Sequence, residues 1–485
     1  MADRSTIPRA STRRRHPSSP TAGVTTAVAA RPTSRPAARP SGRPAVPTAA
    51  ADRPYPGKPR AARRAPRAVT AARAATAATV ARARAGMPAR SAASATRSEP
   101  RAPRDGRLSK LGTAPAIALL TVVLCAFGLV MVGSASPVIS LSLYGSPWAI
   151  FIRQVLWMGV GTGALLILSR VDYRKWRSVR GPLVVVTMGL LVLVLVPPFG
   201  VTAGGSSRWI GVGMFQLQPS ELMKLALAVF AADLLTRRAD RSSEPKMVIV
   251  PVLAVLGISG VLILKQPDMG TALVLSCIAF GILFMGGVPM GPIMKILGTF
   301  TGLAIIVGLA DPYRRDRILS FLNPGANRSG SGYQVWQSLI GLGSGHVFGL
   351  GLGGGRQKWG LLPNAHTDFI FSVVGEELGL VGAVVLLGLF FALAWFGLRA
   401  ATRAPDRFGS LLAVGITTWI TSQAVINIGA VIGVLPVTGI PLPFISFGGS
   451  SLIITMAAMG ILLNIASHER AVPIAPSRRR RPSAA

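Results

Sequence analysis

APAIALLTVVLCAFGLVMVGS, residues 114–134, runs for 21 positions without a charged side chain. A helix of about 20 apolar residues crosses the roughly 30 Å hydrocarbon core of a bilayer. Comparable apolar runs recur as far as residue 466, and this repetition excludes a soluble domain. We therefore predict an all-α, polytopic membrane protein with about ten transmembrane helices. The expected spans are about 114–134, 150–169, 182–199, 219–235, 247–264, 270–286, 292–310, 367–397, 410–435 and 447–466.

The chain before the first span has a different composition. Residues 1–110 hold 24 of the 52 lysines and arginines against four acidic residues, and they are rich in Ala, Pro, Ser and Thr. Such a segment cannot bury enough apolar surface to offset its ordering entropy, so we expect a disordered, basic tail. A transit peptide is the alternative. The charge suits nucleic acid or anionic lipid; we favour lipid and expect no specific nucleic-acid partner.

Lysine and arginine in short loops indicate the orientation of the spans, because they accumulate on the cytoplasmic side. The loops 170–180, 236–246 and 399–407 hold twelve of them, whereas the short loops opposite hold only Arg208 and Lys265. We therefore expect both ends of the chain in the cytoplasm. The domain organisation is then a cytoplasmic tail (1–110), a membrane domain (111–468) and a basic cytoplasmic tail (469–485).

The long loop at about 311–366 then lies outside the cell, although it is basic. It holds six basic residues, Arg314 and Arg315 among them, and only two acidic residues, Asp311 and Asp316. A solvated loop beside the lipid headgroups is one explanation. An anion site is the other, since guanidinium groups bind phosphate oxygens in pairs. The Gly-rich segment 341–358 favours the second, because its backbone N–H groups can approach an anion closely.

Ionisable residues inside the expected spans are a further signal, since each costs at least about 2.5 kcal/mol at bilayer depth. Glu221 and Lys224 are three residues apart and share one helix face. They indicate either a structural ion pair or the lining of a polar cavity. Ser450, in the small-residue start of the last span, fits an anion cradle or a close helix contact.

The densest group of polar residues lies in LPNAHTDFIFSVVGEELGLVG, residues 362–382. His366 and Asp368 are expected at the outer mouth of a helix, with Glu376 and Glu377 roughly 12 Å deeper. A proton relay, a carboxylate pair and ion pairs that pin the helix all remain open.

Cysteine and histidine provide no metal motif. Cys125 and Cys277 lie in apolar runs and are expected to be packing residues. The four histidines are scattered, without a zinc-ligand spacing.

Six motifs occur in a fixed order along the membrane part of the chain. They are RWI at 208–210, QPSELMKLA at 218–226, QPDMGTALV at 266–274, GSGYQVWQSL at 330–339, LPNAHTDFIFSVVGEELG at 362–379 and PLPFISFGGSS at 441–451. Together they resemble the SEDS family of bacterial membrane proteins over about residues 114–466. The chain is most similar to the cell-division members, with elongation and sporulation members as alternatives. Its long basic tail suggests an actinobacterial member.

This resemblance implies a peptidoglycan glycosyltransferase of the bacterial plasma membrane, active at the division septum. Its substrate would be lipid II, a disaccharide-pentapeptide on an undecaprenyl pyrophosphate, and its partner a class B penicillin-binding protein. Other division proteins are also implied, with the tubulin-like ring polymer as a candidate for the basic RRRR at 478–481. The resemblance implies no certain cofactor and leaves a divalent cation open. The residues expected to bind substrate or line its cavity are Arg208, Glu221, Lys224, Arg314, Arg315, Gln334, Lys358, His366, Asp368, Glu376, Glu377 and Ser450.

One position departs from the family pattern. The family shows Asn-Pro, two residues and then Asp-Pro before Gly-x-Gly-Tyr-Gln, and that Asp is the presumed catalytic residue. This chain reads NPGANRSGSGYQ at 323–334, which places Asn327 at the Asp position. An amide cannot accept the proton as a carboxylate does. Asp316 and Asp311 are the candidate substitutes, so the catalytic residue stays unknown.

Two other functions fit the same residues. A transporter that flips the lipid-linked precursor would also place ionisable groups along its pathway. A catalytically weak division scaffold would tolerate Asn327.

The topology can be tested by cysteine labelling. A cysteine at Arg328 should react with a membrane-impermeant maleimide in intact cells, because the long loop is expected outside. A cysteine at Ser242, in the loop 236–246, should react only after permeabilisation. Protection of position 328 in intact cells would refute the assigned orientation.

Overall fold

The computed structural model describes residues 112–197, 199–203, 206–212, 215–239, 245–295, 298–299, 302 and 332–469. The predicted N-terminal tail (1–110) lies wholly outside these ranges, and only Glu469 of the predicted C-terminal tail lies within them. The part of the outer loop that holds Asp311, Arg314, Arg315, Asp316 and Asn327 also falls outside them.

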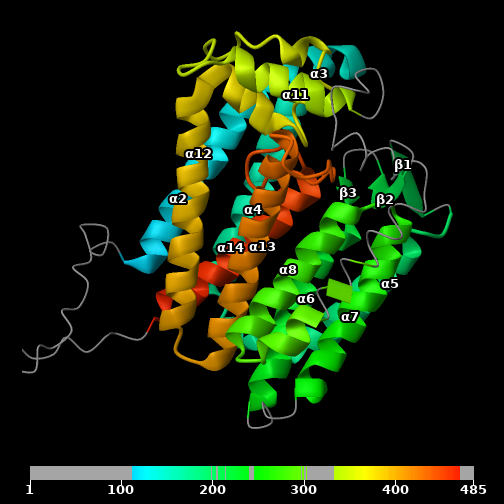
Figure 1. Cartoon of the computed structure of the whole chain (residues 1–485), viewed down its shortest axis with the longest axis vertical. Coiled ribbons are helices and arrows are strands. Elements are labelled where there is room, and N and C mark those ends of the chain that lie inside the picture. Colours follow the sequence, from blue (N-terminus) through cyan, green and yellow to red (C-terminus); the bar gives the residue numbers. More distant parts are fainter. Residues whose placement is uncertain are drawn as a thin grey trace, which may run out of the picture. The chain divides into compact units, whose positions relative to one another are not determined.

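Within the described ranges the chain is built mainly of long apolar helices (Figure 1). Nine of the expected spans coincide with helices, and the span at 292–310 is described only in part. Seven helices are long and apolar enough to cross a membrane, while α8 is shorter and α6 carries buried charges. A multi-pass helical membrane protein is thereby confirmed. The helices are α2 (Thr113–Ala135), α3 (Pro137–Tyr144), α4 (Ala149–Arg170), α5 (Trp176–Leu193), α6 (Pro219–Arg237), α7 (Pro245–Lys265), α8 (Met269–Met285), α11 (Tyr333–Ser344), α12 (Ile370–Arg403), α13 (Arg407–Val431) and α14 (Gly449–Ser467), with 3-10 turns η2 (Tyr173–Lys175) and η4 (Gln357–Trp359).

A small antiparallel sheet between α5 and α6 is an addition to the expected all-α fold. It consists of β1 (Gly200–Ala203), β2 (Ser206–Val212) and β3 (Phe215–Leu217), in the order β1-β2-β3. Ile210 of β2 faces Gly200 on one side and Leu217 on the other. The strands are short and interrupted by glycine, so the sequence shows no clear alternation of apolar and polar residues there.

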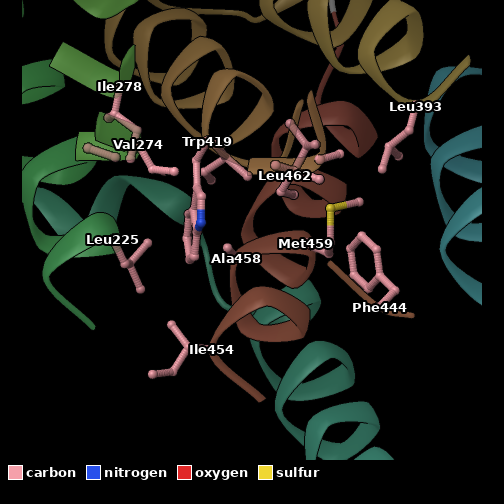
Figure 2. Packing of buried hydrophobic residues seen from close by; sticks show 14 of the residues in the cluster. Leu225, Val274, Ile278, Leu393, Trp419, Phe444, Ile454, Ala458, Met459 and Leu462 are labelled. Atoms are coloured by element: carbon pink, nitrogen blue, oxygen red, sulfur yellow. The ribbon is translucent and has the colours of Figure 1, made fainter. Parts of the chain in front are cut away.

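Helices α4 and α14 approach closely where each presents a glycine to the other helix. A Cβ on Gly460 of α14 would lie 2.5 Å from the Leu165 carbonyl oxygen of α4, and one on Gly161 of α4 would lie 2.6 Å from the Met456 sulfur of α14. Such contacts associate helices in lipid, where the hydrophobic effect does not drive them together. Figure 2 shows the adjoining core, in which the Trp419 indole of α13 lies among apolar side chains from neighbouring helices.

The span expected at 367–397 is interrupted. Helix α12 begins at Ile370 and has a non-helical residue at Gly379, with φ 67° and ψ −164°. This break frees backbone groups that water cannot reach inside a bilayer, so another segment must bind them. The loop after α11 does so: the N–H groups of Leu350 and Gly351 donate to the carbonyls of Glu376 and Glu377 at 3.0 Å each.

Two of the three basic loops that were expected on one side, 170–180 and 399–407, meet at one end of the bundle. The Tyr173 hydroxyl donates to Asp406 at 2.5 Å, and its backbone N–H donates to the Asn464 side chain at 2.9 Å. Arg174 forms an ion pair with the same Asp406 at 3.0 Å. These contacts join the loops 170–180 and 399–407 to the end of α14.

Replacing Gly379 by alanine should destabilise the protein. Its φ and ψ lie in a region that is essentially restricted to glycine, and a Cβ there would be 2.3 Å from the Gly349 nitrogen. We expect a cost of at least about 1–3 kcal/mol, measured as a lower melting temperature in detergent. Gly388→Ala in the same helix is the control, because a Cβ at Gly388 meets nothing within 4 Å. Equal melting temperatures for the two variants would refute the strained break.

Candidate functional site

The N-terminal half of α6 carries a buried ion pair. Pro219 is the first residue of the helix, a position at which its missing N–H costs nothing, and Glu221 lies in the first turn, where the helix dipole favours an anion. The Lys224 Nζ lies 2.6 Å from a Glu221 carboxylate oxygen, and both side chains are only 1% exposed. The pair is thus sealed from solvent, as an ion pair in hydrocarbon must be.

Helix α13 supplies the remaining partners of Lys224. The ammonium group donates to the Gln423 side-chain oxygen at 2.7 Å and lies 5.0 Å from the centre of the Trp419 ring. Gln423 is itself held in place, because its amide donates to the Pro441 carbonyl at 2.9 Å. On the other side of the pair, the Ser451 hydroxyl donates to Glu221 at 3.2 Å.

The start of α14 packs against the start of α6. The Ser450 hydroxyl accepts the Gln218 backbone N–H at 3.3 Å. The Gln218 side chain in turn donates to Asp268 at 3.2 Å, and Asp268 caps α8 by accepting the Thr271 N–H at 3.0 Å. Ser450 therefore takes part in a close helix contact, one of the two roles that the sequence left open.

A second group of expected residues lies beside Gly439, in the segment that joins α13 to α14. The Arg208 guanidinium donates to the Gln266 carbonyl at 2.9 Å and to the Pro267 carbonyl at 2.5 Å. Both Arg208 and Asp368 lie within 4.0 Å of the position that a Cβ on Gly439 would occupy. The structure therefore brings a guanidinium and a carboxylate together beside a residue with no side chain.

The two groups are joined by hydrogen bonds through α13. The Asn427 amide, one turn after Gln423, donates to the backbone carbonyls of Asp368 and Ile440 at 2.8 Å each. Gln423 binds the next carbonyl along, that of Pro441. A polar path thus runs from buried Lys224 to the backbone of Asp368.

His366 lies beside this path. Its ring centre is 5.8 Å from that of Phe447, whose N–H donates to the His366 carbonyl at 3.0 Å. Burial lowers the pKa of the His366 imidazole to about 4, because it disfavours the charged form. The ring is therefore neutral at neutral pH.

Glu376 and Glu377 belong to a separate cluster. The Glu376 carboxylate accepts the backbone N–H groups of Arg356 and Gln357 at 2.7 and 3.2 Å. Glu377 forms an ion pair with Lys358 at 2.8 Å and accepts the Ser134 hydroxyl at 2.6 Å. These contacts match the helix-pinning alternative, and the anion that this Gly-rich segment binds is the chain's own Glu376.

The remaining expected residue, Gln334, lies partly exposed in the first turn of α11. Sequence reasoning did not single out Gln423 and Asn427, although two amides four residues apart in an apolar span were a visible signal. Across the ranges that the structure describes, no three His, Cys, Asp or Glu side chains gather as metal ligands would.

Apolar helices closed around buried ionisable side chains define a multi-pass membrane protein with a polar interior. The family model described as "Cell cycle protein", which covers FtsW, RodA and SpoVE proteins, matches residues 115–471. The chain belongs to this family, which is the SEDS family that its motifs resemble.

Individual relatives agree. The chain is 43% identical over 356 residues to the stage V sporulation protein E of Bacillus subtilis, which covers 73% of this chain and 97% of that protein. It is 43% identical over 354 residues to the probable peptidoglycan glycosyltransferase FtsW of Coxiella burnetii, at 72% and 95% coverage.

Solved structures agree as well. A chain of a peptidoglycan synthase complex that coordinates polymerization and crosslinking matches with TM-score 0.61 and 31% identity, covering 72% of this chain and 96% of that one. The crystal structure of the rod shape determining protein RodA of Thermus thermophilus matches with TM-score 0.54 and 29% identity, at 73% and 97% coverage.

The buried pair of α6 can be tested with a double-mutant cycle. Glu221→Gln and Lys224→Met should each destabilise the protein by about 3–5 kcal/mol, because each leaves one uncompensated buried charge. The double variant should cost less than the sum of the two, since it leaves no charge unpaired. Melting temperatures in detergent measure the three effects, and additive losses would show that the two residues do not interact.

Proposed function

We propose that this chain is a peptidoglycan glycosyltransferase that polymerises lipid II during septal cell-wall synthesis. Membership of the family supports this, as does the name of the FtsW relatives. The observation that carries the proposal is the polar path from Lys224 to Asp368, with Arg208 beside its outer end. A substrate with a lipid tail and a pyrophosphate head requires such polar groups next to an apolar bundle.

The reaction needs a base and a group that stabilises the leaving group. A carboxylate removes the proton from a sugar 4-hydroxyl, the oxygen attacks the anomeric carbon of the donor, and the lipid pyrophosphate departs with the electron pair of the broken bond. Guanidinium groups stabilise the charge that develops on the pyrophosphate. Arg208, which lies beside Asp368 and Gly439, is our first candidate for this role, and Arg314 and Arg315 are further candidates from the long loop.

Three carboxylates are candidates for the base. Asp368 is the one within the described residues that lies next to Arg208. Asp316 and Asp311 belong to the loop in which Asn327 stands at the family's Asp position. Burial or a nearby anion would raise the pKa of such a carboxyl toward the working pH.

The partner that we propose is a class B penicillin-binding protein, which would crosslink the glycan. The similar structure from a peptidoglycan synthase complex supports a crosslinking partner.

We propose that both termini lie in the cytoplasm, because the basic loops are distributed as described above. We propose that the protein acts at the septum, because it is similar to FtsW. The RRRR segment at 478–481 is proposed to contact an acidic division protein such as the tubulin-like ring polymer.

Two observations would also fit other functions. The buried Glu221–Lys224 pair would also suit a flippase for the lipid-linked precursor, because transporters place ionisable groups along their substrate pathways. Asn327 would suit a catalytically weak division scaffold.

Polymerisation of labelled lipid II by the purified protein, with and without its penicillin-binding partner, distinguishes these functions. We expect the original protein to form glycan strands, detected on a gel. The variants to compare are Asp316→Ala, Asp311→Ala and Asp368→Ala, and the one that removes the base should lower the rate of glycan formation at least about 100-fold. Charge reversal at Arg314 and Arg315 should weaken substrate binding. Gly388→Ala is the matched control and should keep full activity.

Absence of glycan under all conditions would contradict the proposal. Transfer of lipid II across proteoliposomes would then favour the flippase. A chain that supports division without either activity would be a scaffold.

A further inference from the structure

Three arginines surround one buried aspartate at the basic end of the bundle. Asp233 of α6 is fully buried, and its carboxylate lies 2.8 Å from Arg177, 2.5 Å from Arg180 and 2.8 Å from Arg237. Arg177 and Arg180 come from the first two turns of α5, and Arg237 follows Asp233 by one turn on α6. The four side chains therefore form a cluster between two neighbouring helices, which we call the Asp233 cluster.

The charges of this cluster do not balance. Three guanidinium groups and one carboxylate leave two positive charges in excess. The start of α5 brings a partial positive charge and the end of α6 a partial negative charge, so the excess comes from the arginines themselves. A negatively charged group at this place would therefore be stabilised.

The arginines are exposed enough to meet such a group. Their side chains are 39%, 31% and 53% exposed for Arg177, Arg180 and Arg237, whereas Asp233 is at 0%. Each guanidinium presents five N–H donors, of which the contacts with Asp233 occupy only a part. The carboxylate lies inside the cluster, and one Arg180 donor also reaches the Arg177 carbonyl at 3.4 Å.

The geometry of the cluster is fixed by its neighbours. The Arg177 guanidinium lies 5.5 Å from the centre of the Phe408 ring, and Phe408 stacks on Tyr173 with ring centres 6.4 Å apart. A guanidinium held in this way loses little rotational freedom when it binds an anion, which favours affinity.

The position of the cluster indicates the kind of anion. It lies where α5 begins and α6 ends, next to the loops 170–180 and 236–246, which border apolar spans. A group at this level meets lipid headgroups, and basic pockets between transmembrane helices bind anionic lipids such as cardiolipin. Lipid phosphates are forked acceptors that suit guanidinium geometry.

We infer that the Asp233 cluster binds the phosphates of an anionic phospholipid headgroup, with the two phosphates of cardiolipin as the best match to its two excess charges. Asp233 holds the three guanidinium groups together and is not itself a ligand. The proposal concerns the end of the bundle opposite Arg208 and does not depend on the enzymatic function.

The test is native mass spectrometry of the full-length protein in detergent, titrated with cardiolipin, phosphatidylglycerol or phosphatidylcholine. We expect cardiolipin to bind most tightly and phosphatidylcholine to bind weakly. Arg177→Gln/Arg180→Gln should weaken cardiolipin binding roughly 10- to 30-fold, because each guanidinium that directly contacts a lipid phosphate contributes about a fivefold factor. Arg170→Gln/Lys175→Gln is the control: it removes the same charge from exposed residues of the same end and should change binding less than about threefold.

A conservative variant covers the case in which the glutamine variant does not fold. Arg177→Lys/Arg180→Lys keeps the charges around Asp233 but lacks the guanidinium fork, so it should fold and still bind cardiolipin more weakly than the original protein. Equal weakening by the control pair would overturn the proposal, since general surface charge would then suffice. Displacement of cardiolipin by millimolar inorganic phosphate would assign the cluster to a soluble anion. If the Arg177→Gln/Arg180→Gln variant no longer bound an acidic division protein but bound lipid as before, the Asp233 cluster would be assigned to a protein partner.

Discussion

An ionised side chain inside a hydrocarbon layer has no water to solvate it, so it must bring its partners with it. The bundle meets this constraint three times. Lys224 is paired with Glu221 one turn away, Lys358 reaches Glu377 from a loop, and Asp233 collects three arginines. The Glu221–Lys224 pair lies within α6, whereas the other two pairings join separate elements, the loop to α12 and α5 to α6. The arrangement of the helices and of the loop after α11 therefore follows from where these charges are neutralised.

The three groups serve different purposes because their surroundings differ. The Glu221–Lys224 pair continues through Gln423 and Asn427 into a polar path that ends at the backbone of Asp368. The Glu376 carboxylate accepts backbone N–H groups and the Glu377 carboxylate pairs with Lys358. These contacts hold the loop after α11 against α12. The charge of a residue is a poor guide to its function unless its partners are known.

The sequence predicts the helices well, because an apolar run and a long helix are two expressions of the same constraint. The span expected at 219–235 becomes Pro219–Arg237, and buried Glu221 and Lys224 pair as their spacing indicates. Partnerships between distant segments could not be predicted. Nothing near Gln423 in the chain reveals that Lys224 will donate to it, and the break at Gly379 depends on a loop some thirty residues earlier. The small sheet could not be predicted either, because its strands are short and interrupted by glycine.

The break in α12 also has a consequence for the order of assembly. The N–H groups of Leu350 and Gly351 emerge from the ribosome before the carbonyls of Glu376 and Glu377 that accept them. During synthesis these donors have no acceptor within the bundle until the following segment has been inserted. This end of the bundle is therefore completed late, and a nascent chain halted before residue 376 would reach the membrane with that end unfinished.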